Sequence, residues 1–119
     1  MLAIRRTNTI IYCANWAESV AFYGEQLGLH ATFENDWFVE FELTSSSYVS
    51  VADHTRSTIA PNHGNGLTLS WEVPDLGLIR SRLIAAGVEV GELGSRWGAT
   101  TLDLHDPEHN RIELWSTAP

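Results

Sequence analysis

The sequence predicts one α+β domain made of two βαβββ halves around a small-molecule cavity, with the helices on the outside. Its 119 residues suit a single domain. Hydrophobic residues make up 44% and aromatic residues 10%, which are globular values. The order strand, helix, glycine, three strands occurs twice. Such a repeat indicates two similar units that each need the other to bury an apolar face.

The first half is predicted over residues 4–53. Apolar residues in 4–13 indicate a strand. A period of about 3.6 residues predicts a helix from Trp16 to Leu27, with Phe22 on the flank of its apolar stripe. Gly28 ends this helix by supplying a left-handed conformation. Three short strands are then expected near 30–35, 37–43 and 47–53.

The connection between the halves is predicted over 54–65, where Pro, Gly, Asn and Ser gather. The second half, about 66–116, begins with clean alternation in 67–73. A helix starts at Pro74–Asp75, with Ile84 on its apolar side, and ends at Gly87. The remaining elements are a short strand at 88–92, a loop at 94–98 and a hairpin of strands 99–105 and 110–116.

Charge and composition narrow the partners. The net charge of −8 repels phosphate backbones and anionic lipid, so nucleic acid and membrane partners are not expected, while a basic ligand is favoured. No stretch reaches the roughly 20 apolar residues of a membrane span, and the N-terminus does not read as a signal peptide. The lone Cys13 excludes an internal disulfide. We therefore expect a cytoplasmic protein.

Two segments carry a family resemblance. Residues 15–29 are similar to a "D-x-x-x-S-x-x-F-Y-x-x-x-L-G" helix, and residues 106–115 to a "D-P-D-G-N-x-I-E-L" hairpin in which His109 replaces the glycine. Both resemble the vicinal oxygen chelate superfamily, which includes glyoxalase I, bleomycin-resistance proteins and extradiol dioxygenases. The resemblance implies a curved, mostly antiparallel eight-stranded sheet around the cavity, and a homodimer. Asn110 is expected to take the positive φ before the last strand.

Metal-dependent members of that superfamily hold a divalent ion with four side chains on the inner face. The resemblance places these positions at Asn8, Ser50, Thr68 and Glu113, and only Glu113 is a good ligand. We therefore expect no metal cofactor, with a divalent ion at Glu113 together with Asn8 or His105 as the alternative. Glu113 is also the candidate catalytic base, and a pair with His105 could move a proton.

Strand alternation predicts which side chains face the cavity. Trp37 and Trp97 occupy equivalent positions in the two halves, where they either pack at the rim or fold over a ligand. The predicted ligand-binding residues are Asn8, Tyr12, Tyr48, Ser50, Thr68, Ser70, Glu72, Trp97, His105, Glu113 and Trp115.

The leading hypothesis is a metal-free protein that sequesters a small aromatic or cationic compound, similar in role to the bleomycin-resistance group. It follows from the incomplete ligand set beside a surface of aromatic and carboxylate side chains. The alternative is a metal-dependent lyase, isomerase or dioxygenase with an altered ligand set. A third hypothesis is a protein that mainly contacts another protein.

Overall fold

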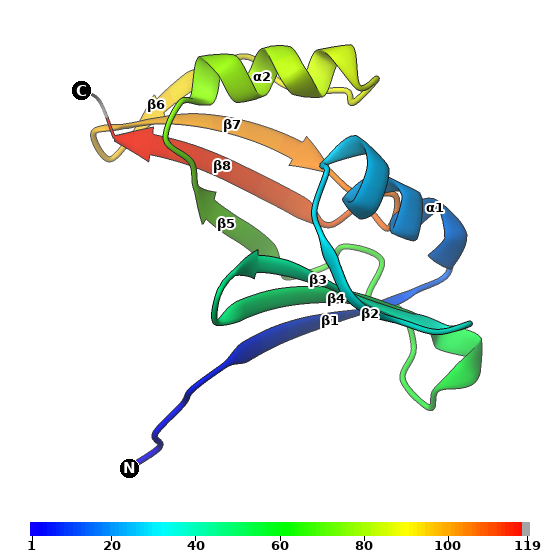
Figure 1. Ribbon diagram of the computed structural model, residues 1–119. Coiled ribbons are helices and arrows are strands. Elements are labelled where there is room, and N and C mark those ends of the chain that lie inside the picture. Colours follow the sequence, from blue (N-terminus) through cyan, green and yellow to red (C-terminus); the bar gives the residue numbers. More distant parts are fainter. Residues whose placement is uncertain (118–119) are drawn as a thin grey trace. The chain divides into compact units, whose positions relative to one another are not determined.

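A computed structural model describes residues 1–117, which divide into two compact units, one up to Asn62 and one from His63 (Figure 1). Each unit has the order strand, helix, three strands, so the predicted α+β class and the two βαβββ modules are confirmed. The eight strands of residues 1–117 form two four-stranded sheets. The single eight-stranded sheet of the prediction is not confirmed. Within residues 1–117, neither helix is long and apolar enough to cross a bilayer.

The first unit has the sheet order β1-β4-β3-β2. Its β1 and β4 run parallel, whereas β3 is antiparallel to both of its neighbours. This mixture follows from the connections, because a helix returns the chain to a parallel strand and tight turns join antiparallel ones. The elements are β1 (Thr7–Cys13), α1 (Trp16–Ala21), a π-helical turn (Phe22–Gln26), β2 (Ala31–Glu34), β3 (Phe38–Thr44) and β4 (Ser47–Asp53).

The second unit repeats this topology with the order β5-β8-β7-β6. Its β5 and β8 are parallel, and β7 is antiparallel to β6 and β8. In this unit α2 lies across one face of β7 and β8 (Figure 1). The elements are β5 (Thr68–Glu72), α2 (Leu76–Ala85), β6 (Gly94–Arg96), β7 (Ala99–His105) and β8 (Arg111–Thr117), preceded in the first unit by a 3-10 turn (His54–Arg56).

The first helix differs from the predicted one in its last turn. The amide of Leu27 donates to the carbonyl of Phe22 at 2.8 Å, five residues back, so the last turn is a π turn. Phe22, predicted on the flank, is instead buried beside Tyr23, because the buried face of the helix consists of Ser19, Phe22 and Tyr23. Tyr23 in turn packs against Phe41 of β3, with ring centroids 6.1 Å apart. Gly28 ends the segment with φ +71°, as predicted.

The second helix begins as the sequence predicts. The carboxylate of Asp75 accepts the amide of Leu78 at 3.1 Å and so caps the first turn. Leu76 and Leu83 are buried on the sheet side. Ile84, which the periodicity assigns to the apolar side, is 50% exposed, because it lies next to Leu83 at the edge of the contact face.

The segment before β7 corrects the prediction of a strand at 88–92 and a loop at 94–98. Residues 88–92 contribute one bridge, between Val90 and Leu104, and the strand is instead Gly94–Arg96. Trp97 and Gly98 both have positive φ, +55° and +77°. A two-residue turn of this kind matches the twist of antiparallel strands, which is why pairing resumes on both sides of it.

The turn before β8 is held by one buried carboxylate. Asp106 accepts the backbone amides of Glu108 and Asn110 at 2.9 and 2.8 Å, and the side-chain amide of Asn110 at 3.0 Å. The left-handed residue is His109, with φ +70°, and not Asn110 as predicted. The hydrogen bonds to Asp106 fix the residues on both sides, so the positive φ falls between them. His109 stands where the resembling hairpins have glycine, which explains that preference.

Candidate functional site

The sheet of the second unit has one apolar and one mainly polar face. Ile112 and Leu114 of β8 are buried, as are Leu102 and Leu104 of β7. Side chains alternate along a strand, so the residues between them point to the opposite face. We call this second surface the polar face of unit two. Its residues on β7 and β8 are Thr101, Asp103, His105, Arg111, Glu113 and Trp115.

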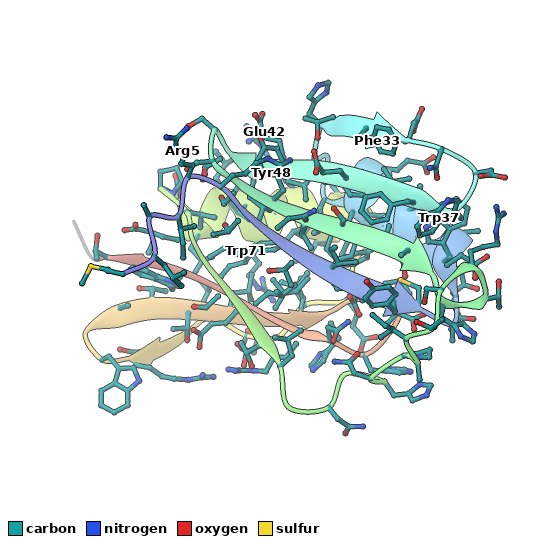
Figure 2. All side chains as sticks on the ribbon, turned by 90° about the horizontal axis from the view of Figure 1, so that it is seen from below. Arg5, Phe33, Trp37, Glu42, Tyr48 and Trp71 are labelled. Carbon is teal, nitrogen blue, oxygen red and sulfur yellow. The ribbon has the colours of Figure 1, made fainter. Side chains whose placement is uncertain are left out.

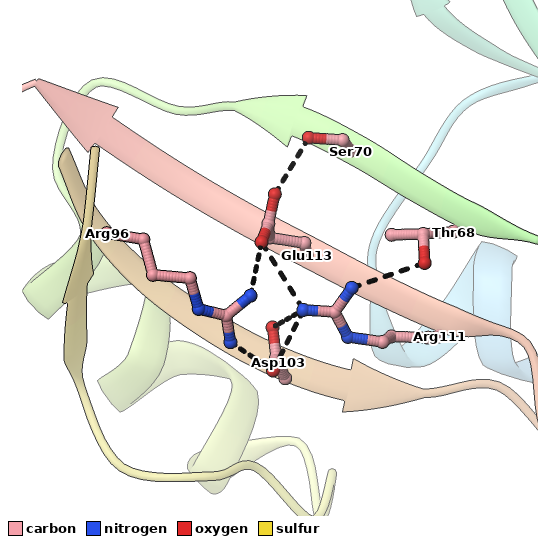
Figure 3. A network of polar contacts seen from close by, with 6 residues as sticks. All are labelled: Thr68, Ser70, Arg96, Asp103, Arg111 and Glu113. Atoms are coloured by element: carbon pink, nitrogen blue, oxygen red, sulfur yellow. Dashed lines mark hydrogen bonds and ion pairs between the residues drawn. The ribbon is translucent and has the colours of Figure 1, made fainter.

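A charge-paired cluster occupies the middle of this face (Figure 3). Glu113 accepts Ser70 Oγ on Oε1 at 3.1 Å, and Arg96 Nη1 and Arg111 Nη2 on Oε2 at 2.9 and 3.3 Å. The unit-two cluster consists of Thr68, Ser70, Arg96, Asp103, Arg111 and Glu113.

The two arginines of this cluster also share a second carboxylate. Arg96 Nη2 donates to Asp103 at 3.0 Å, and Arg111 Nη2 lies 3.2 Å from both Asp103 oxygens. Arg111 Nη1 reaches Thr68 Oγ1 at 3.2 Å. Two guanidinium groups therefore balance two carboxylates, and the cluster carries no net charge.

A pocket of about 320 Å³ lies beside this cluster. Its volume is at the small end of the range for ligand pockets, about 300–1,000 Å³. Two indole rings contribute to its lining, one from the β6–β7 turn and one from β8. The lining residues are Ser70, Arg96, Trp97, Ala99, Thr101, Glu113 and Trp115.

Trp97 is unusual in both exposure and backbone. Its side chain is 100% exposed, and its φ of +55° is rare for a bulky residue. Two-residue turns with positive φ at both positions strongly prefer Asn-Gly or Asp-Gly. The turn geometry explains Gly98 but not a tryptophan before it. An exposed, strained aromatic residue at the edge of a pocket is a candidate for ligand contact.

The first unit carries a second polar cluster, the unit-one cluster, on its own sheet. Arg6 pairs with Glu40 at 2.6 Å and also lies over the ring of Tyr48, 3.7 Å from its centroid. Glu40 accepts Thr32 Oγ1 at 2.7 Å, and Asn8 Nδ2 at 3.5 Å. Tyr48 lies opposite Glu42 in the β3–β4 register, and both side chains are labelled in Figure 2. The members are Arg6, Asn8, Thr32, Glu40, Tyr48 and Ser50.

The electrostatics of the unit-one cluster centre on Glu40. Hydrogen bonds from Arg6 and then from Thr32 lower the pKa of the Glu40 carboxyl below its ordinary value, against a smaller opposing effect of burial. The buried Ser50 donates to Asn8 Oδ1 at 2.8 Å, so both groups of the Asn8 amide have partners. The members of this cluster therefore bind one another within the first unit.

The predicted ligand-binding residues fall into separate groups. Ser70, Trp97, Glu113 and Trp115 line the 320 Å³ pocket. The others lie outside its lining. In the second unit, Thr68 is hydrogen-bonded to Arg111, His105 is exposed opposite Arg111, and Glu72 lies by a shallow pocket with Val73, Pro74 and Thr117. In the first unit, Asn8, Tyr48 and Ser50 belong to the unit-one cluster. Tyr12 is half-buried opposite Ala52.

The sequence reasoning missed the arginines. Arg111 lies two residues before Glu113 on β8, so the alternation that selects Glu113 also selects Arg111. Arg6 likewise lies two residues before Asn8. The signal for Arg96 is weaker, because it needs a strand at Gly94–Arg96 where the sequence predicts a loop.

The side chains at the four metal-ligand positions suit a divalent ion poorly. In the second unit Glu113 lies within 3.3 Å of two guanidinium groups, which would repel a cation, and Thr68 Oγ1 is bound to Arg111. In the first unit Asn8 and Ser50 bind each other. Across residues 1–117 no group of three or more His, Cys, Asp and Glu side chains gathers as a metal site would require.

The duplicated βαβββ fold, with a polar face on each sheet, defines a class of two-module α+β proteins. The chain belongs to the Glyoxalase/Bleomycin resistance protein/Dioxygenase superfamily, whose family model matches residues 5–114. A search of curated proteins finds no match.

Solved structures share the fold at low sequence identity. Lactoylglutathione lyase from Agrobacterium tumefaciens is 17% identical with a TM-score of 0.74, covering 92% of this chain and 91% of that one. TnmS3, an antibiotic binding protein from Streptomyces sp. CB03234, is 17% identical with a TM-score of 0.79, covering 99% and 98%. A glyoxalase/bleomycin resistance protein/dioxygenase from Nocardioides is 18% identical with a TM-score of 0.78, covering 98% and 84%.

Proposed function

We propose that this protein is a metal-free binding protein that sequesters a small aromatic compound in the pocket of the second unit. One observation carries the proposal: two indole rings, Trp97 and Trp115, line a single pocket beside a charge-neutral polar cluster. Indole rings give large contact area at low cost in conformational entropy, and they stack on other aromatic rings. The pocket therefore suits a flat ligand.

The pairing of Glu113 favours an aromatic over a cationic ligand. A free carboxylate would attract an ammonium group, but Arg96 and Arg111 already balance the charge of Glu113. A cation at this position would have to displace a guanidinium or sit beside one. The cationic ligand of the sequence hypothesis thus loses its main attraction, and the aromatic one keeps both tryptophans.

A structural neighbour supports the same class of function. TnmS3 is an antibiotic binding protein, so this fold is used for ligand binding in at least one neighbour. The lyase neighbour shows that the fold also supports catalysis, so fold alone does not choose between the two. The poor donor set at the four metal-ligand positions is the reason to choose binding here.

The proposal is tested by titrating protein that has been treated with EDTA. Three naphthalene probes, 2-naphthoate, 2-naphthalenemethanol and 2-naphthylmethylammonium, are added while tryptophan fluorescence and calorimetric heat are recorded. We expect saturable binding of at least one probe, with affinity reduced in Trp115→Leu and unchanged in Trp37→Phe, a control outside the pocket lining. Absence of binding by every probe would contradict the proposal.

Elemental analysis of the purified protein tests the metal-free part separately. We expect no stoichiometric divalent ion, and no gain in probe affinity after incubation with zinc, manganese or iron(II). A stoichiometric ion that is lost together with probe binding would favour the metal-dependent lyase, isomerase or dioxygenase instead.

The proposed setting is cytoplasmic, and the proposed assembly is a homodimer, which the family resemblance implies. Light scattering after size exclusion measures the assembly. A mass equal to one chain across the accessible concentration range would contradict it.

A further inference from the structure

We infer that the ligand of the unit-two pocket is a planar aromatic compound that carries a hydrogen-bond acceptor, a carboxylate or carbonyl, and that Arg96 binds this acceptor. The inference rests on the proposed function and specifies the ligand class for the same pocket. It follows from which hydrogen-bonding groups of the pocket are still available once the unit-two cluster has formed.

The charged side chains of the pocket leave more donors than acceptors unused. Within residues 1–117, Arg96 makes two hydrogen bonds, from Nη1 to Glu113 and from Nη2 to Asp103. A guanidinium carries more N–H donors than these two, including the one on Nε. The acceptor side is more fully used, because Glu113 Oε2 already accepts two guanidinium groups and Oε1 accepts Ser70. A ligand acceptor therefore finds several unused N–H donors on Arg96, whereas Glu113 retains about one lone-pair site, on Oε1.

Exposure points in the same direction. The side chain of Arg96 is 44% exposed and that of Glu113 is 20% exposed. Both line the pocket, so the group that an incoming ligand meets first is the guanidinium. A planar guanidinium can bind a carboxylate through two parallel hydrogen bonds, which gives geometric specificity as well as energy.

Arg96 and Trp97 are consecutive residues of the β6–β7 hairpin, and both line the pocket. Trp97 combines a positive φ with a fully exposed side chain. Its indole forms no ring contact with another aromatic residue within residues 1–117. An aromatic acid or ketone would use both neighbours at once, its ring on Trp97 and its oxygen on Arg96.

The overall charge opposes an anion only at long range. The chain carries −8, which lowers the rate at which an acid approaches. At about 0.15 M ionic strength the Debye length is about 8 Å, so the local pairing of Arg96 decides affinity inside the pocket. Titrations at this ionic strength therefore report the site and not the whole surface.

The three naphthalene probes test the inference, because they share one ring system and differ in the polar group. We expect 2-naphthoate to bind at least about tenfold more tightly than 2-naphthylmethylammonium, with 2-naphthalenemethanol between them. In Arg96→Gln this preference should fall to about twofold or less, because the free donors are lost and Glu113 loses one of its cations. Arg96→Lys should retain part of the preference, since it keeps the charge but not the fork.

Arg80→Gln is the matched control. Arg80 belongs to the same unit, pairs with Glu92 and lies outside the pocket lining, so the variant makes the same change in net charge. It should leave the preference for 2-naphthoate unchanged. Circular dichroism confirms that each variant is folded.

Each outcome decides the inference. A naphthoate preference that Arg96→Gln abolishes and Arg80→Gln retains supports it. Equal binding of all three probes, tighter binding of the ammonium, or a preference that survives Arg96→Gln overturns the inference and leaves the proposed function intact. Failure of every probe to bind overturns both.

Discussion

The two units place their polar groups at equivalent positions and use them differently. In the first sheet Glu40 of β3 lies opposite Ser50 of β4, and in the second sheet Asp103 of β7 lies opposite Glu113 of β8. The middle strand of each sheet thus carries a carboxylate paired with arginine. The neighbouring strand carries a buried hydroxyl in one unit and a second carboxylate in the other.

The same register shows how the aromatic residues differ. Phe38 of β3 lies opposite Ala52 of β4, whereas Thr101 of β7 lies opposite Trp115 of β8. In the first unit Phe38 contacts Trp37, at a ring distance of 5.5 Å. In the second unit the small Thr101 and Ala99 leave room, and Trp115 lines the pocket instead. A duplicated backbone therefore carries a mutually bound polar cluster in one half and a pocket lined by Trp115 in the other.

Exchanging the side chains at the equivalent positions should give the largest difference in stability between the two units. Ser50 is fully buried and bound to Asn8, so Ser50→Glu should place a carboxylate in a closed site and cost about 3 kcal/mol or more of unfolding free energy. Glu113→Ser affects a partly exposed side chain and should cost about 1 kcal/mol. Urea denaturation measures both. Equal losses of unfolding free energy would mean that the site of Ser50 is no less tolerant of change than the site of Glu113.

A second effect separates the two arginines of the unit-two cluster. Arg111 contacts Thr68, Asp103 and Glu113, and Arg111→Gln should destabilise the protein by about 1–2 kcal/mol. Arg96 is more exposed and lies on a three-residue edge strand, so Arg96→Gln should cost less than about 1 kcal/mol. We therefore expect Arg111 to act mainly in stability and Arg96 mainly in the proposed ligand binding. A larger loss of stability for Arg96→Gln would reverse these roles.

A third effect is a gain in stability. Trp97→Asn should stabilise the protein by about 0.5–1 kcal/mol, because asparagine adopts positive φ more easily and the indole makes no ring contact in the fold. The same variant should weaken binding of the naphthalene probes by at least about fivefold. Thermal denaturation and fluorescence titration measure the two changes. If stability rises while affinity is unchanged, the exposed indole has no part in binding.

The smallest expected effect is a pH dependence of stability that arises from Glu40 in the unit-one cluster. Since the folded-state pKa of Glu40 is lowered, its pairing with Arg6 and Thr32 stabilises the protein above the ordinary value of 4.5. This contribution is lost as pH falls from 4.5 through the lower folded-state pKa. Glu40→Gln should therefore lose less stability than the wild type between about pH 6 and about pH 3.5. Parallel pH dependences in urea denaturation would rule out this contribution.

Most of the fold was predictable because periodicity and glycine positions are local signals. The helix ends at Gly28 and Gly87, and the strands β1, β3, β4, β5, β7 and β8, follow from them. The predictions that fail concern features that local sequence patterns do not determine. The periodicity does not signal the π turn that follows α1, and the choice between 88–92 and 94–96 as a strand depends on which segment β7 pairs with.

The sequence predicts which side chains of the candidate site share a sheet face, but not which of them form ion pairs. Alternation selects Ser70, Glu113 and Trp115 as neighbours on one face. It does not show that Arg96 and Arg111 pair with Glu113. That pairing depends on the strand register and on how far the long arginine side chains extend across it, neither of which can be read from the sequence. The sequence therefore suggested an aromatic or cationic ligand, and the proposal of a ligand acceptor rests on this pairing.

The proposed function requires that the second unit bind a planar ligand in the pocket lined by Trp97 and Trp115, without a metal. The most direct measurement follows the indole N–H signals of the five tryptophans in a ¹⁵N-correlated NMR spectrum. EDTA is present, and the tightest-binding naphthalene probe is added. We expect saturable shifts of the Trp97 and Trp115 signals and a nearly constant Trp16 signal, because the Trp16 N–H donates to the carbonyl of Val51. Shifts confined to Trp16, Trp37 or Trp71, or no shifts, would contradict it.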